Sequence, residues 1–192
     1  MRLLRFVIFA GLLSACDADA RGVQKYSLSI PADWRPWSGA VDPLVPGEVL
    51  EAHELSVPSG AASLIVFRSL HRPATTAAQL LIETRHLLLN LPSLEIQAER
   101  LIEVKGQNQK HRALVIEVTA SGTGKTLSPT GTGKPVHPSG EPQIATRRIW
   151  VRVPLGPGGG TLEVFFHCPQ EEHSNLTAVW TAILDSLLLL GE

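Results

Sequence analysis

A cysteine flanked by two histidines is the part of the sequence whose residue types could carry catalysis. Cys168 follows His167 directly, and His173 lies shortly after it. An imidazole beside a thiol can generate a reactive thiolate, and the same three side chains could begin a zinc site. Adjacent residues of a strand point to opposite faces, so a strand over this segment separates Cys168 from His167. We therefore predict a buried, structural Cys168, no catalytic residue and no metal site.

Two glycine-rich segments imitate loops that bind nucleotides. Gly124-Lys125-Thr126 looks like the end of a phosphate-binding loop, but that motif also needs a glycine at position 119, which is Thr119 here. Residues 156–160 lack the helix that must follow a dinucleotide-binding loop, and they read as a hairpin turn. We therefore predict no nucleotide and no cofactor.

Arg148, Trp150 and Arg152 alternate along a probable interior strand and share one of its faces. An indole between two guanidinium groups could form a cation–π shelf for an anionic or aromatic partner. In the alternative reading, Trp150 packs under a helix while the arginines reach its edge or pair with Glu163 and Glu117 on neighbouring strands. Both readings stay open at this point.

Trp37 poses the same choice, because it lies in a turn that carries two indoles, Trp34 and Trp37. We expect Trp34 to seal the sheet edge. Trp37 could be an exposed anchor for a partner or for the membrane interface. Trp37, Arg148, Trp150 and Arg152 are thus the predicted binding residues.

The charge of the chain argues against one class of partner. The sequence has 17 Lys and Arg and 18 Asp and Glu, and Arg2 and Arg5 belong to a short apolar leader. Without that leader the chain has three more acidic than basic side chains. A protein that binds nucleic acid usually has a basic face, so we predict no nucleic-acid partner.

The first residues have the layout of a bacterial lipoprotein signal. Arg2 and Arg5 precede an apolar run, and Leu13-Ser14-Ala15-Cys16 resembles a lipobox. This resemblance implies cleavage before Cys16 and attachment of lipid to its thiol, which would anchor the protein to the membrane of the cell envelope. The apolar run is well short of the roughly 20 residues that span a bilayer. A rival cleavage site, Ala18-Asp19-Ala20, would instead release a soluble exported protein.

The predicted organisation is therefore a signal peptide over residues 1–15, the lipidated Cys16 with a short tether over 16–24, and one domain over 25–192. Within that domain, alternation of apolar and polar residues predicts strands over 25–30, 49–57, 62–70, 94–104, 112–119, 144–153 and 161–168. Apolar residues on both faces make 112–119 a central strand. Residues 121–143 are rich in Ser, Thr, Gly and Pro, and we expect a flexible loop there.

Two helices complete the predicted domain. The first begins at a cap provided by Thr75 or Thr76 and buries one stripe that contains Leu80, Leu81, Leu87, Leu88 and Leu91. The second runs from about 175 to 190, with Ser174 or Asn175 as its cap. Its buried stripe contains Val179, Ile183 and Leu187. Successive antiparallel strands with helices between the groups indicate an α+β fold.

At the level of families, the chain resembles the PsbP/Mog1/DcrB-like superfamily. The resemblance rests on the strand Tyr26-Ser27-Leu28-Ser29-Ile30-Pro31 followed by Trp34, on the helix that starts near Thr76, and on the final helix with Leu184-Asp185-Ser186-Leu187. It implies a twisted antiparallel sheet sandwiched between helices, in a superfamily of accessory, assembly and chaperone proteins. No functional residue carries over.

These observations predict a membrane-anchored envelope lipoprotein whose domain binds a protein partner in a non-catalytic, accessory role. A second hypothesis is a small-molecule-binding exported protein that uses a cleft between sheet and helix. A third, a hydrolase-type enzyme that uses His167, Cys168 or His173, stays open as well.

Overall fold

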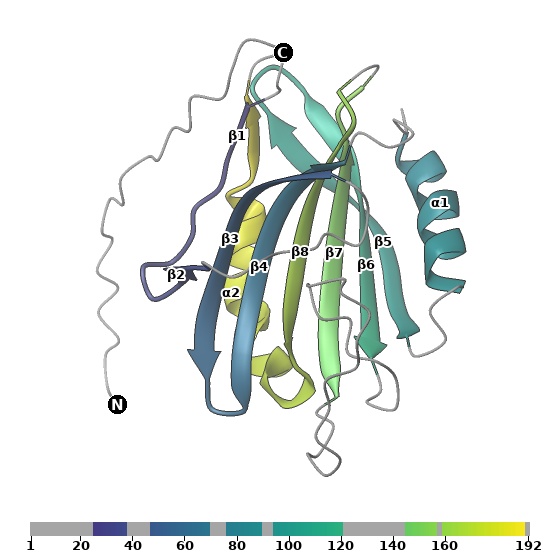
Figure 1. Ribbon diagram of the computed structural model, residues 1–192. Helices are drawn as coiled ribbons and strands as arrows, with labels where there is room; N and C mark the ends of the chain where they lie inside the picture. The colour runs from purple at the N-terminus through teal and green to yellow at the C-terminus, as the bar shows by residue number, and fades with distance from the viewer. Residues whose placement is uncertain are drawn as a thin grey trace, which may run out of the picture.

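The protein is described here from a computed structural model that covers residues 25–37, 47–69, 76–89, 94–120, 145–156 and 159–190 (Figure 1). The predictions for the signal peptide, for Cys16 and its tether, and for the loop 121–143 lie outside the described residues. None of the helices within these ranges has the length and the apolar composition needed to cross a membrane.

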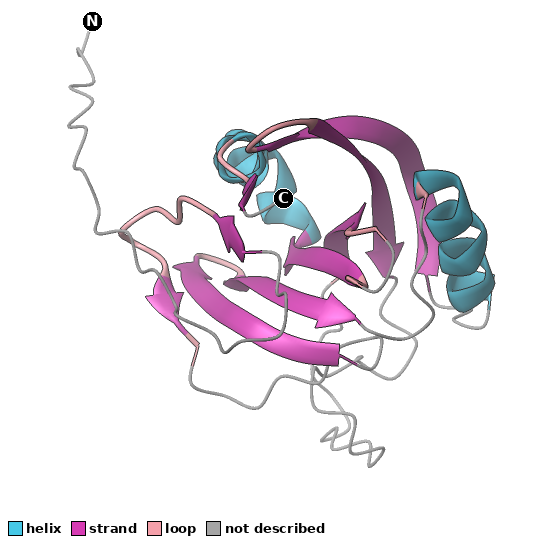
Figure 2. Ribbon diagram, turned by 90° about the horizontal axis from the view of Figure 1, so that it is seen from above, coloured by secondary structure: helices cyan, strands magenta, loops and turns pink. Residues whose placement is uncertain are grey.

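A nine-stranded sheet forms the body of the domain, in the order β1-β9-β5-β6-β7-β8-β4-β3-β2. All neighbouring strands are antiparallel except β5 and β9, which run parallel. The sheet is therefore mixed, which corrects the prediction of a purely antiparallel sheet. Seen from above, it curls strongly between its two ends (Figure 2). The strands are Lys25–Ser27 (β1), Arg35–Pro36 (β2), Gly47–Val57 (β3), Gly60–Ser69 (β4), Leu94–Gly106 (β5), Lys110–Ala120 (β6), Thr146–Pro154 (β7), Thr161–Pro169 (β8) and Leu188–Leu190 (β9).

Strand β6 lies between β5 and β7, and its apolar residues are buried on both faces, as its pattern predicts. Val115 belongs to the core on the side of one helix, whereas Leu114 and Ile116 belong to the core on the side of the other. The two helices therefore cover opposite faces of the sheet. This arrangement confirms the predicted α+β fold with helices on both sides.

Helix α1 spans Ala77–Leu89. Its first turn is closed by a reciprocal pair of hydrogen bonds, because Gln79 N donates to Thr76 Oγ1 and Thr76 N donates to Gln79 Oε1. Thr76 is thus the cap. The buried positions are Ala77, Leu80, Thr84 and Leu88. Leu80 and Leu88 of the predicted stripe are thus buried, whereas Leu87 is exposed, which corrects the prediction for that residue. Leu91 lies outside the described residues.

Helix α2 spans His173–Asp185 and follows a short 3₁₀ turn, Gln170–Glu172. Its cap is Glu172, so the predicted caps Ser174 and Asn175 lie inside the first turn. Leu176, Trp180 and Ile183 are buried, and Leu187 is buried just beyond the helix. Residues 188–190 leave the helical path because they form β9 between β1 and β5, where Leu189 is fully buried. The predicted helix therefore ends about one turn early.

The first predicted strand is also shorter than its pattern suggests. Only Lys25–Ser27 pairs with β9, while Leu28 and Ile30 pack against the core without pairing. Trp34 is buried on the same side and contacts the Phe166 ring, with 5.9 Å between the ring centroids. Phe166 in turn stacks on Trp180 of α2. Phe166 of β8 is therefore packed between Trp34, which precedes β2, and Trp180 of α2.

Candidate functional site

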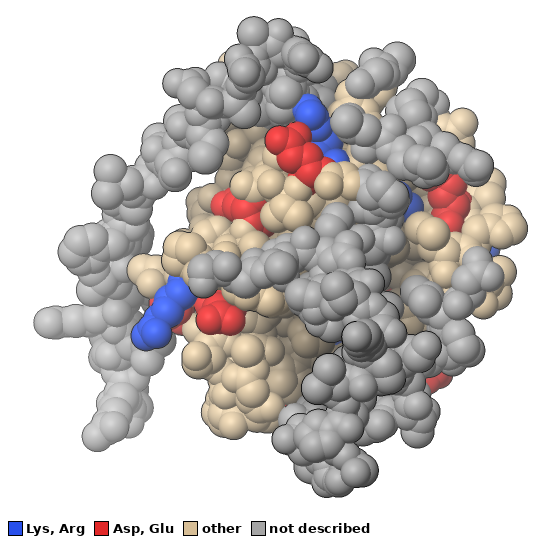
Figure 3. All heavy atoms as spheres, in the orientation of Figure 1, with Lys and Arg blue, Asp and Glu red and all other residues tan. Residues whose placement is uncertain are grey.

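Two regions of the molecule combine polar side chains with aromatic rings: the predicted arginine–tryptophan row on the α1 side, and a cleft between β5 and α2. On the face shown in Figure 3, basic and acidic side chains of the described residues lie in small mixed groups. Charge by itself does not mark a binding surface there.

The arginine–tryptophan row is buried against α1. Arg148, Trp150 and Arg152 are only 6%, 4% and 3% exposed. Glu163 of β8, which is fully buried, receives a hydrogen bond of 2.6 Å from Trp150 Nε1. It also receives two bonds of 3.1 Å from Arg152. The Arg152 guanidinium lies over the Trp150 ring, 4.6 Å from its centroid.

The same network ties the sheet to α1. Arg152 Nη1 donates to Thr84 Oγ1 at 2.6 Å, and that hydroxyl donates to the carbonyl oxygen of Leu80 at 2.6 Å. Burial raises the pKa of the Glu163 carboxyl, and the Arg152 guanidinium and the Trp150 N–H oppose that rise. Arg152 and Trp150 are thus engaged within the fold, as the structural reading expects.

Arg148 does not pair with Glu117, which is the ion-pair partner considered for it from the sequence. Glu117 lies on the opposite face of the sheet, where it binds Arg147 at 2.9 Å and Arg100 at 3.1 Å. Arg148 lies beside His167 in the register of β7 and β8, and its Nε has no hydrogen-bond partner among the described residues. Burial lowers the pKa of the Arg148 guanidinium.

Trp37 is half-buried and packs with Trp150, Ile65 and Phe67. Its backbone N–H donates to the Ala52 carbonyl oxygen at 2.9 Å. The fold therefore brings Trp37 and Trp150 into one apolar cluster on the α1 side, next to Arg152. The binding role of these residues stays a prediction.

His167 yields a prediction about acid stability. Burial and the nearby Arg148 lower its pKa to about 4, from an ordinary value near 6.5. The unfolded chain therefore binds a proton on this side chain between pH 6.5 and pH 4 that the folded chain does not bind. The resulting stability is present above pH 6.5 and is lost as the pH falls toward 4, by about 3 kcal/mol.

Urea unfolding of the wild type and of His167→Gln at pH 7.5 and pH 4.5 measures this contribution. The variant is expected to lose less stability on acidification than the wild type, because glutamine does not titrate. Equal losses in both proteins would show that His167 is not held neutral by the fold.

Cys168 and His167 lie on opposite faces of the sheet, as the alternation of a strand predicts. Cys168 is fully buried on the α2 side of the sheet, whereas the His167 side chain lies on the α1 side. Burial raises the pKa of the Cys168 thiol to about 11. Within the described ranges, no group of three or more His, Cys, Asp or Glu is placed to hold a metal ion.

Cys168 is therefore expected to resist alkylation in the folded protein. In a Cys16→Ala chain, where it is the only cysteine, iodoacetamide at pH 8 should modify it at least about 100-fold more slowly than in urea. The rate is followed by intact mass. Comparable rates in the folded and unfolded states would contradict the burial and reopen a nucleophilic role.

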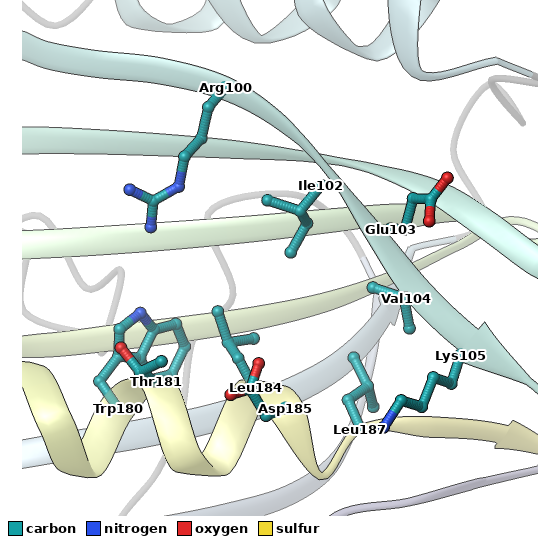
Figure 4. Close-up of a pocket in the computed structure, with 10 residues that line it drawn as sticks. All are labelled: Arg100, Ile102, Glu103, Val104, Lys105, Trp180, Thr181, Leu184, Asp185 and Leu187. Atoms are coloured by element: carbon teal, nitrogen blue, oxygen red, sulfur yellow. The ribbon is translucent and has the colours of Figure 1, made fainter.

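A cleft between β5 and α2 is the feature that sequence reasoning did not locate (Figure 4). Its volume is about 350 Å³. Its apolar wall consists of Ile102 and Val104 of β5, Leu184 of α2, and Leu187, which follows α2. The alternation of β5 and the helical stripe each indicated these side chains as apolar, but only the folded chain brings the two segments together around a cleft.

One end of the cleft carries hydrogen-bond donors. The Trp180 indole is 2% exposed and is held by stacking on Phe166, with 4.7 Å between the ring centroids. Its Nε1 has no hydrogen-bond partner among the described residues, and the nitrogen points toward the side of the cleft that carries Arg100 (Figure 4). A buried donor without a partner costs free energy. This end of the cleft is therefore suited to an acceptor atom from outside the fold.

Comparison with known proteins supports the fold. No protein-family model matches the sequence, and a sequence search of curated proteins finds no match. Among solved structures, the chain is similar to LpqN, which is involved in cell envelope biogenesis of Mycobacterium tuberculosis. The TM-score is 0.58 with 13% identity, covering 88% of this chain and 86% of LpqN.

Two further structures are similar. PA94 of Pseudomonas aeruginosa, a protein of unknown function, gives a TM-score of 0.52 with 10% identity over 84% of this chain and 94% of PA94. Cyanobacterial PsbP from Synechocystis gives a TM-score of 0.46 with 10% identity over 93% of this chain and 99% of PsbP. At these identities the likeness concerns the fold: the chain has an α+β fold similar to that of an envelope biogenesis protein.

Proposed function

We propose that this protein is a membrane-anchored lipoprotein of the cell envelope whose single domain binds a small molecule and catalyses no reaction. Three observations support the proposal. The Leu13-Ser14-Ala15-Cys16 segment has the layout of a lipidation signal. The domain has a fold similar to that of LpqN, a protein of envelope biogenesis. The described residues contain a cleft of about 350 Å³ between β5 and α2.

The cleft is the observation that carries this function. Its volume lies at the small end of the range of ligand pockets, ~300–1,000 Å³. It combines an apolar wall with a buried donor that lacks a partner, which is the usual composition of a site for a small ligand. A filled interface between β5 and α2 would have argued against a small-molecule site.

The experiment is mass spectrometry of the protein purified from its native membrane fraction. Intact mass should show a chain that starts at Cys16 with added acyl mass, and Cys16→Ala should lack that mass. A start at Arg21 without lipid would contradict the anchor. Under native conditions, a noncovalent small molecule should accompany the domain.

A matched pair of variants tests whether that molecule occupies the cleft. Thr181 lines the cleft on α2, and Thr177 lies one turn earlier, outside the lining. Both are exposed, and each hydroxyl donates to the carbonyl oxygen four residues before it. Thr181→Phe should displace the molecule, while Thr177→Phe should retain it. Retention by both variants, or no bound molecule in the wild type, would contradict binding in this cleft.

A protein partner is the second candidate, and a separate observation favours it. The large apolar side chains exposed in the described parts all lie on α1 or β5: Ile82, Leu87, Leu89, Ile96 and Leu101. Arg85 of α1 pairs with Glu99 of β5, so these two elements form one surface. Contiguous exposed apolar surface is typical of protein interfaces.

We propose that an envelope protein contacts this α1–β5 surface. A photocrosslinking residue at position 89 should give a specific crosslinked product in intact cells, and one at exposed Glu54 of β3 should not. Ile82→Glu should abolish the product. A crosslinked product that survives Ile82→Glu would contradict a role of this surface.

A further inference from the structure

We infer that the ligand of the cleft between β5 and α2 is an amphipathic carboxylate, with its head group at Trp180 and Arg100 and an apolar tail along Ile102 and Leu187. This inference rests on the proposed function, because it names the class of molecule that the same cleft would hold. The argument has three steps: the donors at one end, the apolar wall, and the charges around the opening.

The donors at the Trp180 end favour an acceptor with two oxygens. Trp180 Nε1 is buried without a partner in the described part of the chain, so an acceptor oxygen there would satisfy it. Arg100 lies across the cleft from the indole (Figure 4). Its Nη1 is held by Glu117 at 3.1 Å, which fixes the guanidinium and leaves further N–H groups for a ligand. A carboxylate can accept from the indole and the guanidinium together.

The apolar wall favours a short aliphatic chain. Ile102 and Val104 of β5 face Leu184 of α2 and Leu187, which follows α2, along the length of the cleft away from Arg100 (Figure 4). At ~30 Å³ for each group about the size of a water molecule, 350 Å³ holds about a dozen non-hydrogen atoms. Decanoate, a saturated ten-carbon carboxylate, has this size and both chemical features.

The charges around the opening favour an anion over a cation. Glu103 is already paired with Lys110 at 2.6 Å, and its carboxylate points away from the cleft in Figure 4. Lys105 lines the far end and has no ion pair within the described ranges. Asp185 also lines the cleft, beside Leu184. The cleft therefore has two basic side chains, Arg100 at the Trp180 end and Lys105 at the far end, against the carboxylate of Asp185.

Isothermal titration calorimetry with three ten-carbon probes tests the inference on the full Cys16→Ala chain. Decanoate should bind at least about tenfold more tightly than decan-1-ol, and decylamine should bind more weakly than either. Trp180→Phe retains a ring to stack on Phe166 but removes the N–H. This variant should bind decanoate about tenfold more weakly than the wild type does, while its affinity for decan-1-ol should stay within about twofold of the wild-type value.

Arg100→Gln should also weaken the binding of decanoate more than the binding of decan-1-ol. Arg85→Gln is the matched control, because Arg85 is 57% exposed and ion-paired, as Arg100 is at 52%, but lies on α1 outside the cleft. The control should bind decanoate as the wild type does. Melting temperatures of all variants, measured without ligand, identify any variant that fails to fold, and Arg100→Lys then replaces Arg100→Gln.

Equal affinity for decanoate and decan-1-ol, or unchanged decanoate binding by Trp180→Phe and Arg100→Gln, would overturn the inference. A chain that carries a native ligand displaced by Thr181→Phe, but does not bind decanoate, would overturn the carboxylate assignment while the proposed function stands. A chain that binds none of the probes and carries no native ligand would overturn both.

Discussion

Replacement of Glu163 by leucine is expected to lower the free energy of unfolding by about 3–5 kcal/mol. Glu163 is fully buried and accepts hydrogen bonds from Trp150 and Arg152. Without its carboxylate, the Arg152 guanidinium remains charged and 97% buried, with Thr84 as its remaining hydrogen-bond partner. Most of the loss arises from that unpaired charge and not from the bond itself.

A double-variant cycle separates these two causes. Glu163→Leu combined with Arg152→Met removes both charges, so it should be considerably more stable than Glu163→Leu alone. Urea unfolding at pH 7.5 gives the free energies of all four proteins. If Glu163→Leu lowers the free energy of unfolding by less than about 1 kcal/mol, the network contributes little to the packing of α1 on the sheet.

Replacement of Ile183 by alanine is expected to cost about 2–5 kcal/mol. Ile183 is 1% exposed in the core between α2 and the sheet, and its neighbours along the same stripe, Trp180 and Leu187, are equally enclosed. Truncation leaves a cavity that surrounding side chains fill only in part, so the loss exceeds the transfer free energy of the removed atoms.

The matched control is Ile82→Ala. Ile82 also lies in a helix but is 62% exposed, so its truncation should change stability by about 0.5 kcal/mol or less. Thermal unfolding of both variants and the wild type provides the comparison. A melting temperature of Ile183→Ala equal to that of the wild type would mean that α2 packs on the sheet through another face.

Much of the fold could be predicted because the signals are local. Thr76 and Gln79 mark the first turn of α1, because their capping hydrogen bonds join residues only three positions apart. Apolar residues on both faces of 112–119 mark a strand covered on two sides, and β6 is that strand. The stripe of α2 with Ile183 follows directly from helical periodicity.

The errors occur where distant pairing decides the outcome. Residues 188–190 continue an apolar, helix-compatible run, yet they form β9, because the edge of β5 and the strand β1 offer hydrogen bonds that an exposed helical end would lack. No local pattern in the sequence of β5 or β9 predicts that these two strands pair in parallel. Leu87 and Leu88 are identical residues in adjacent positions, and only contact with the sheet decides that Leu88 is buried.

The sequence by itself determined the α+β class, most of the buried stripes of the helices and the polar–aromatic row on β7, because these depend on residue type and spacing. The lipidation signal that it predicts lies outside the described residues. Only the tertiary structure decided the environment of the residues in the stripes and the row. The register of β7 and β8 places Glu163 opposite Arg152. This pairing buries the arginine–tryptophan row, whereas alternation alone could not decide whether the row is buried or exposed. Only the folded chain brings β5 and α2 together around a cleft that the Trp180 indole lines, since these segments lie far apart in the sequence.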